Sequence, residues 1–337
     1  MVAQARAPRV LPADALSLRM NSSFRSIAVA GAGAVGSYFG AMLARADQRV
    51  TLLGRAPHVA TIERDGLQLH KGGAVEVVRL RASTDLAAVH DADLVLFCVK
   101  STDTEAAGRG IAPHLSPDAL VLSLQNGVDN AATLARIVPC PVVPAVVYVA
   151  TALSAPGVVE HFGRGDLLIG PMNAAQAADA ALAQRLHAVV DLFAAAGVPV
   201  TISPDVMREL WNKLMVNCAY NAVSGLAQQP YGAMVGVPEV VELQRAVVRE
   251  VVAVAQAEGV RLDLEASLQA MARIAGAMPA QMSSTAQDMV RGKRSEIDHL
   301  NGTIVRLGSR HGIAVPANQA LFALVKLVEA RRGGALP

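Results

Sequence analysis

Short apolar runs alternate with helix-length segments in the first half of the chain. The runs are 26–31, 49–54, 93–100, 119–125 and 141–149, rich in Val, Leu and Ile and bounded by Gly, Pro, Asp or Asn. Between the early runs lie segments of helix length, such as 34–46 and 102–114. Strands that are apolar throughout and alternate with helices are typical of a parallel sheet covered on both faces. The first half therefore predicts an α/β domain.

After about residue 174 the apolar positions recur with the 3.6-residue period of helices. Helices are predicted over 174–196, 205–226, 237–258, 263–277, 295–311 and 317–331. Pro204, Pro238, Pro279 and Pro316 each lie near a predicted helix start, where proline is tolerated. An all-helical domain is expected to follow the α/β domain, joined to it near 197–204.

Length and composition fit two domains. A chain of 337 residues is long for one core, and its 53% hydrophobic and 17% charged residues supply ample apolar surface to bury. The expected division is a loose N-terminal extension (1–24), an α/β domain (25–200) and a helical domain (201–332). The extension lacks the continuous apolar region of a secretory signal, so a cytoplasmic location is expected.

Charge and cysteine usage exclude several classes of function. The formal net charge is +2 and aromatic residues are 3%, which gives no case for a nucleic acid or a membrane as a partner. The most apolar run, 141–153, is shorter than a membrane span. Three distant cysteines without a C-x-x-C motif are expected to be buried free thiols, and no metal site is predicted.

A glycine-rich motif follows the first predicted strand directly. It reads Gly31-Ala32-Gly33-Ala34-Val35-Gly36, a G-x-G-x-x-G at a strand-to-helix turn. The first glycine allows the turn, the second lets the backbone approach a pyrophosphate, and the third lets helix and strand pack closely. The N–H groups of the helix start then face the phosphates. With a second strand at 49–53, the motif predicts that the α/β domain is a dinucleotide-binding Rossmann domain.

The end of the second strand bears on which dinucleotide binds. NAD-binding domains usually have an acidic residue there, which accepts a hydrogen bond from the ribose 2′-hydroxyl. This chain has Gly54 and Arg55, with no carboxylate before Glu63. A guanidinium suits a 2′-phosphate, so NADPH and NADP+ are favoured over NADH. The alternative is that Arg55 is an ordinary surface arginine.

Two polar residues follow later strands of the same predicted sheet. Lys100 ends the third apolar run, and Asn126 follows the fourth in the sequence SLQNG. Ligands of open α/β sheets bind at the carboxyl ends of the strands. Lys100 and Asn126 are therefore predicted to contact the cofactor near its ribose and nicotinamide.

The predicted helix 205–226 carries a polar stripe on an otherwise apolar sequence. Lys213, Asn217 and Asn221 are spaced four residues apart, so they lie along one side of a helix. An ammonium can polarise a carbonyl group and then protonate it, and amides can hydrogen-bond substrate oxygens without adding charge. The stripe predicts a substrate site with Lys213 as general acid. The alternative is a solvent-facing lysine with asparagines that bridge helices.

A second polar cluster lies in 283–302, among apolar helices. Ser284 can hold a substrate carboxylate by a neutral hydrogen bond, and Glu296 can orient Lys213 or bind a substrate hydroxyl. Ser283 and Ser295 also have the chemistry of helix N-caps, which is the structural alternative for this cluster.

These motifs together resemble the ketopantoate reductases (2-dehydropantoate 2-reductases) of the 6-phosphogluconate-dehydrogenase-like superfamily, over about residues 25–330. The shared motifs are GAGAVG, VK at 99–100, QNG at 125–127, WNKLMVNCAYNAVSGL, SSTAQDMVRGKRSEIDHLNG and HGIAVPANQALF. The resemblance implies a Rossmann domain, a helical C-terminal domain and an active site between them. It implies NADPH-dependent reduction of 2-dehydropantoate to (R)-pantoate in pantothenate biosynthesis, and a homodimer is compatible with it.

By position, the resemblance assigns the general acid to Lys213 and a glutamate near cofactor and substrate to Glu296. Its substrate-binding residues fall on Asn217, Asn221 and Ser284, and its cofactor-binding residues on Arg55, Lys100 and Asn126. One further asparagine of some members falls near Tyr231, which is a departure from the pattern.

Two other functions stay open on the sequence. A paralogue that reduces another branched or aromatic 2-oxo acid, or a 3-hydroxy acid dehydrogenase, would share the Lys–Asn spacing. An NADPH-sensing regulatory protein would also keep the cofactor motif, but it would not need Lys213, Ser284 and Glu296 together. The SEIDHLNG block (295–302) and Arg55 favour the NADPH-dependent 2-oxo acid reductase, in particular ketopantoate reductase.

Overall fold

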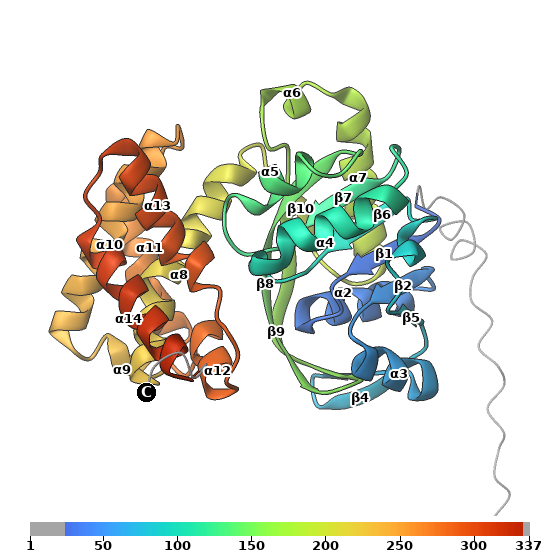
Figure 1. Cartoon of the computed structure of the whole chain (residues 1–337), viewed down its shortest axis with the longest axis horizontal. Helices are drawn as coiled ribbons and strands as arrows, with labels where there is room; N and C mark the ends of the chain where they lie inside the picture. Colours follow the sequence, from blue (N-terminus) through green and yellow to red (C-terminus); the bar gives the residue numbers. More distant parts are fainter. Residues whose placement is uncertain (1–23, 333–337) are drawn as a thin grey trace, which may run out of the picture.

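The computed structural model describes residues 24–332, which form a sheet-containing half and a helical half (Figure 1). We call them the α/β domain and the helical domain. The predicted extension 1–24 lies outside the described residues except for Phe24, which is 3% exposed and packs in the core of the α/β domain. No helix in the described part of the chain has the length and apolarity needed to cross a membrane.

The α/β domain is built on a ten-stranded sheet with the order β4-β3-β9-β8-β7-β6-β1-β2-β5, and β10 pairs with β9. Its parallel part comprises β1 (Ile27–Ala30), β2 (Val50–Leu53), β5 (Arg81–Ser83), β6 (Leu94–Phe97), β7 (Leu120–Ser123) and the start of β8 (Val142–Ala155). The central strands β1, β6 and β7 are buried along their whole length, which explains their continuous apolar sequences. The predicted α/β fold is confirmed.

The sheet is mixed rather than purely parallel, which differs from the sequence prediction. β8 pairs with β7 through Val142–Pro144 and then continues in a long antiparallel hairpin with β9 (Val158–Ile169). The strands β3 (Leu67–Lys71) and β4 (Ala74–Val78) add an antiparallel edge, and β3 pairs with β9 in parallel. β4 is exposed at four of its five residues, and β9 mixes buried and exposed positions, so these strands lack the buried apolar runs that marked the central strands.

Helices cover both faces of the sheet. The helices α2 (Ala34–Arg45), α3 (Ala56–Asp65) and α7 (Ala180–Ala195) pack on one face in a common core. The helices α4 (Thr104–Ile111) and α5 (Asn130–Ala135) pack with a 3₁₀ segment, Leu86–Val89, in the core of the other face. Shorter elements are the 3₁₀ turns Ser101–Asp103 and Ala112–His114, α6 (Ala174–Ala177) and β10 (Val200–Ile202). Because β10 crosses the predicted boundary at 200/201, the division into 25–200 and 201–332 stays a prediction.

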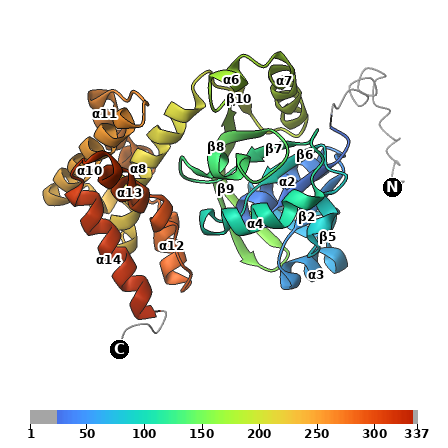
Figure 2. The same cartoon turned by 45° about the horizontal axis from the view of Figure 1, so that its top comes forward.

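The helical domain is arranged around α8 (Val206–Ala227), which leaves the α/β domain and runs through the helical bundle (Figures 1 and 2). Around it lie α9 (Tyr231–Met234), α10 (Pro238–Ala257), α11 (Leu264–Ala277), α12 (Ser284–Val290), α13 (Asn301–His311) and α14 (Pro316–Arg332). One apolar core joins α8 to these helices and includes Trp211, Met215 and Cys218. Pro238 and Pro316 are the first residues of their helices, as predicted.

Two predicted boundaries in the helical domain are wrong. The helix expected over 295–311 starts at Asn301, after a 3₁₀ turn at Ile297–His299. Ser295 does not start α13: its hydroxyl donates to the Glu329 carboxylate and accepts from the Ile297 N–H, at the start of the 3₁₀ turn. Pro279 precedes a loop, and the next helix, α12, is capped by Ser283, whose side chain accepts from the Ala286 N–H.

A buried polar network fixes the position of α14. The Asn318 side chain is fully buried; it donates to the Glu250 carboxylate at 2.7 Å and accepts from Asn301 at 2.9 Å. Glu250 also accepts from the first free N–H groups of α14 at Ala317 and Asn318. Asn301 donates in turn to the Cys218 carbonyl of α8. Helices α8, α10, α13 and α14 are therefore joined by buried hydrogen bonds.

We expect Asn318→Ala to lower the free energy of unfolding by about 1–3 kcal/mol, because it removes one buried hydrogen bond from Asn301 and one from Glu250. Urea unfolding followed by circular dichroism measures the loss. The matched control is Gln319→Ala, since Gln319 is exposed on the same turn. Equal midpoints for the two variants would show that the network does not stabilise the domain.

Candidate functional site

The glycine-rich turn has the geometry that its sequence predicts. Gly31 has a φ of +102°, and a Cβ there would lie 2.7 Å from the Val99 nitrogen. A Cβ on Gly36 would lie 2.3 Å from the Gly31 oxygen, so α2 approaches β1 too closely for a side chain. The three intervening positions carry small or half-buried side chains: Ala32, Ala34 and Val35.

Gly33 differs from both of these glycines. It is exposed, it is the N-cap of α2, and a Cβ built on it would meet nothing within 4 Å. Its φ of −77° is accessible to any residue, so backbone strain does not require glycine here. Open space beside the N-terminus of a twelve-residue helix is the cradle that a dinucleotide pyrophosphate would fill. The residues of this turn therefore fit a dinucleotide.

Arg55 lies at the end of β2, beside this turn. It is the N-cap of α3, its side chain is exposed, and no ion pair joins it to another residue of 24–332. The segment before Arg55 packs closely against the glycine-rich turn, because a Cβ on Gly54 would lie only 2.9 Å from the Ala32 Cβ. Arg55 is thus an exposed cation near the turn that forms no ion pair with a described residue, and its role in binding a 2′-phosphate stays a prediction.

Lys100 and Asn126 of the α/β domain both contact the helical domain, Asn126 at Glu296 and Lys100 at Asp288. The Glu296 carboxylate accepts from the Asn126 side chain at 3.0 Å, and from the Ser101 N–H at 3.0 Å and hydroxyl at 2.9 Å. Lys100 donates to the Asp288 carboxylate at 3.0 Å and to the Arg294 carbonyl at 2.8 Å. These contacts bring together residues 170 to 195 positions apart in the chain.

Sequence reasoning missed the residues that hold this group in place. Ser101 donates to the Asn126 carbonyl and to Glu296, and Asn130 donates to Ser101 and to the Asn126 carbonyl. Gln125 donates to the Val99 carbonyl and to Thr104. Ser101 and Gln125 adjoin Lys100 and Asn126 in sequence, and Asn130 follows four residues after Asn126, so closeness to the predicted residues was the available signal.

Lys213 is partly buried where α8 meets the β8–β9 hairpin. Its ammonium donates to the Val147 carbonyl at 2.5 Å and lies 5.7 Å from the centroid of the Tyr148 ring. Burial lowers the pKa of Lys213 to about 8, the Glu296 carboxylate opposes this shift, and the Arg164 guanidinium adds to it. A lysine that changes its charge near neutral pH suits proton transfer.

The other members of the stripe have different environments. Asn217 is half-buried, and its side chain has no hydrogen bond to a described residue. Asn221 is 3% exposed and accepts from the Tyr231 hydroxyl at 3.4 Å. Ser284 is exposed at the first position of α12. Tyr231, the residue that departs from the family pattern, thus directly contacts a predicted substrate-binding residue.

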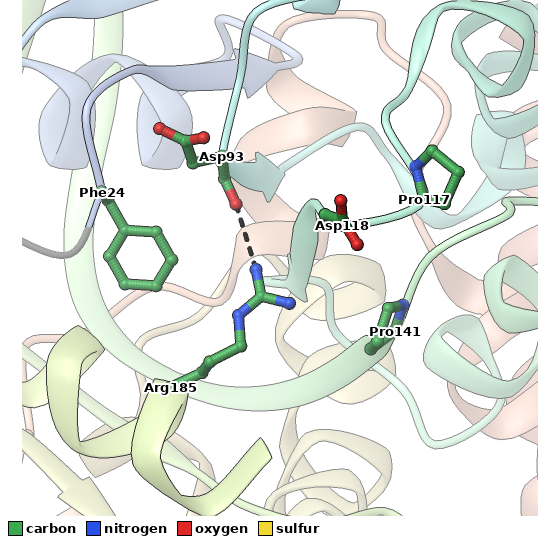
Figure 3. Close-up of a pocket in the computed structure, with 6 residues that line it drawn as sticks. All are labelled: Phe24, Asp93, Pro117, Asp118, Pro141 and Arg185. Atoms are coloured by element: carbon green, nitrogen blue, oxygen red, sulfur yellow. Dashed lines mark hydrogen bonds between the residues drawn. The ribbon is translucent and has the colours of Figure 1, made fainter. Parts of the chain in front are cut away.

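A cavity of about 450 Å³ lies elsewhere, at the edge of the sheet away from these residues. Figure 3 shows Arg185 pointing into it beside Phe24, with Asp93 and Asp118 opposite. The Arg185 guanidinium donates to the Asp93 and Ala119 carbonyls, which anchors α7 to the ends of the strands. None of the predicted site residues lines this cavity. Within residues 24–332, no group of three His, Cys, Asp or Glu residues is placed to hold a metal ion.

Family models match both halves of the chain. The model described as ketopantoate reductase PanE/ApbA matches residues 27–174, and the model for the C-terminal part of the same family matches 205–329. The chain belongs to the ketopantoate reductase family. The resemblance inferred from the motifs is confirmed.

Individual relatives agree with this family assignment. The chain is 36% identical over 306 residues to a 2-dehydropantoate 2-reductase of Halobacterium salinarum, covering 90% of this chain and 98% of the relative. The crystal structure of a PanE/ApbA family ketopantoate reductase from Ralstonia eutropha JMP134 matches this chain with 52% identity and a TM-score of 0.85. The match covers 91% of this chain and 99% of that protein. The structure of D-mandelate dehydrogenase with NADH and anilino(oxo)acetate matches with 26% identity and a TM-score of 0.84. That match covers 91% of this chain and 99% of the dehydrogenase.

The two glycines of the turn should separate folding from ligand binding. We expect Gly36→Ala to lower the melting temperature, because its Cβ collides with backbone. Gly33→Ala should leave stability within about 0.5 kcal/mol but weaken dinucleotide binding at least tenfold, since the methyl group enters the open cradle. Thermal melts without cofactor and fluorescence titration with cofactor measure the two effects. Unchanged affinity in Gly33→Ala would contradict a pyrophosphate site at this turn.

Proposed function

We propose that the protein reduces 2-dehydropantoate to (R)-pantoate with NADPH as the reductant. The observation that carries the proposal is Lys213, a partly buried amine with a pKa of about 8 at the junction of the two domains. This chain aligns with nearly the whole length of relatives named 2-dehydropantoate 2-reductase, which supports the same substrate here.

The chemistry of the reaction explains the need for this lysine. When bound, NADPH would supply a hydride to C2 of the 2-oxo acid. Negative charge then develops on the C2 oxygen, and a protonated amine in hydrogen-bond reach stabilises it and donates the proton. Lys213 is proposed to be this acid, and the neutral amine regains its proton from solvent. Arginine cannot take the role, because its pKa is too high for it to release a proton.

The neighbouring residues are proposed to bind and orient. The Gly31–Gly36 turn would hold the pyrophosphate, and Lys100 and Asn126 the parts of the cofactor nearer the reacting end. Glu296, fixed by Ser101 and Asn126, places a negative charge that favours the protonated form of Lys213. Asn217, Asn221 and Ser284 would hydrogen-bond the substrate carboxylate and hydroxyl groups.

The preference for NADPH rests on Arg55. No acidic side chain follows β2 before Glu63, and the Arg55 side chain is exposed beside the turn. D-mandelate dehydrogenase, whose structure matches this chain, was solved with NADH. NADH therefore binds one protein of this fold, and in this chain we propose that Arg55 recognises the 2′-phosphate of NADPH.

A second candidate is a reductase of an aromatic 2-oxo acid. Two observations favour it. D-mandelate dehydrogenase, which is similar to this chain, was solved with the 2-oxo acid analogue anilino(oxo)acetate. Tyr231, which departs from the family pattern, contacts the predicted substrate-binding residue Asn221. A panel of 2-oxo acids that includes 2-dehydropantoate and phenylglyoxylate, assayed by NADPH oxidation, distinguishes the two. A kcat/KM at least tenfold higher for the aromatic acid would overturn the leading proposal.

We expect Lys213→Ala to lower kcat by roughly 10²–10⁴ with stability and NADPH affinity retained. Lys213→Arg keeps the charge but cannot deliver a proton, so it should also be slow. Since the reaction needs the protonated amine, wild-type kcat/KM should be level below pH 8 and fall about tenfold per pH unit above it. Near-normal kcat in both variants would mean that the proton comes from another group.

We expect Arg55→Ala to raise KM for NADPH by about 30-fold, because a charge-assisted contact worth about 2 kcal/mol is lost. KM for NADH should change little. Arg64→Ala, an exposed arginine at the end of the same helix, is the matched control. Equal losses with both cofactors would assign Arg55 a structural role instead.

A further inference from the structure

An irregular stretch interrupts the long β8–β9 hairpin beside Lys213. Arg164 has a φ of +54°, which is uncommon for a residue with a side chain, and Gly165 next to it has a φ of +138°. The register between the strands shifts at Tyr148/Val149 and again at Ala150/Thr151. Backbone outliers of this kind persist where the surrounding structure holds them, and they gather at functional sites.

The consequence of this backbone is the position of the Arg164 side chain. Its guanidinium carbon lies 4.1 Å from the centroid of the Tyr148 ring, so the two groups stack. Its Nε and Nη2 atoms donate to the two oxygens of Asp166, at 3.0 and 2.6 Å. The guanidinium is therefore held on two sides, although the side chain remains accessible to solvent.

Lys213 shares the same aromatic ring. Its ammonium lies 5.7 Å from the Tyr148 centroid and donates to the carbonyl of the preceding residue, Val147. Both cations lie beside the Tyr148 ring, so the distance between them cannot exceed the sum of their distances to its centroid. The Arg164 charge is therefore close enough to act on Lys213 electrostatically. No role for Arg164 follows from the family motifs quoted above.

We propose that Arg164 is a positioning residue for Lys213: it holds the Tyr148 ring against the ammonium, and its fixed positive charge makes Lys213 a better proton donor. This inference rests on the proposed function in taking Lys213 as the acid. Arg164 itself need not touch the substrate.

The charges around Lys213 agree with this role. Glu296 favours the ammonium and Arg164 disfavours it, beside the larger effect of burial. Glu209 lies one turn before Lys213 on α8, and the Asp166 carboxylate accepts hydrogen bonds from Arg164. Burial raises the pKa of the Tyr148 phenol. Asp288 of α12 is paired with Lys100. The helices that pack on the rest of α8 contribute the apolar core of the domain.

The first test compares three variants by the pH dependence of kcat/KM for the best substrate of the panel. Arg164→Gln removes the charge and should move the alkaline fall to higher pH by on the order of half a unit, after allowance for solvent screening. Arg164→Lys keeps the charge, so the fall should stay near the wild-type pH while kcat drops. Arg109→Gln removes a distant exposed arginine and should move nothing.

The second test reads Lys213 without turnover, so it still applies if the proposed substrate is wrong. The chain has five lysines, Lys71, Lys100, Lys213, Lys293 and Lys326. Reductive ¹³C-dimethylation gives each a resolvable NMR signal, and loss of one signal in Lys213→Arg assigns the acid. Its titration should shift upward in Arg164→Gln and not in Arg109→Gln.

An unchanged Lys213 titration in Arg164→Gln, or an equal shift in Arg109→Gln, would overturn the proposal. If Arg164→Gln does not fold, the Lys213 titration in Arg164→Lys and Asp166→Asn tests the proposal instead. Asp166→Asn removes a negative charge beside Arg164, so the titration must stay or move downward, and an upward move would refute the charge effect. A Lys213 that titrates as proposed in a protein inactive on every 2-oxo acid would instead refute the proposed function alone.

Discussion

The carboxylate of Glu296 is the interaction on which the geometry of the site depends. It belongs to the helical domain, yet its hydrogen-bond donors, Ser101 and Asn126, belong to the α/β domain. Hydrogen bonds to a charged group are each worth about 1.5–3 kcal/mol, and these are partly shielded from water. The same carboxylate influences the charge state of Lys213. One side chain thus joins the two domains and stabilises the charged form of Lys213.

Most of the fold follows from the sequence for simple physical reasons. Strands β1, β6 and β7 are buried on both faces and must be apolar throughout, so their sequences show where they lie. Helix α2 and its glycines were predictable because collisions at Gly31 and Gly36 exclude side chains. The stripe on α8 was visible because amide and amine groups are costly in an apolar core unless something polar faces them.

The remaining features depend on contacts between distant segments. Strand β9 has exposed and buried positions mixed, with Arg164 and Gly165 in left-handed conformations, so its pattern is neither apolar nor strictly alternating. The pairing of Lys100 with Asp288 joins residues 188 positions apart, and no local pattern encodes it. The contact of Tyr231 with Asn221 depends on the turn after α8, which ends at Gln228 in a left-handed conformation.

The path of α8 has a mechanical consequence. The helix starts at Val206 beside the sheet and rises about 1.5 Å per residue, so Lys213 is about 10 Å and Asn221 about 22 Å from its first residue. If the helical domain pivots about the start of α8, displacement grows with distance along this lever. Lys213, which also donates to the Val147 carbonyl, would move less than half as far as Asn221. Such a pivot would displace Asn221 about twice as far as Lys213 relative to the α/β domain.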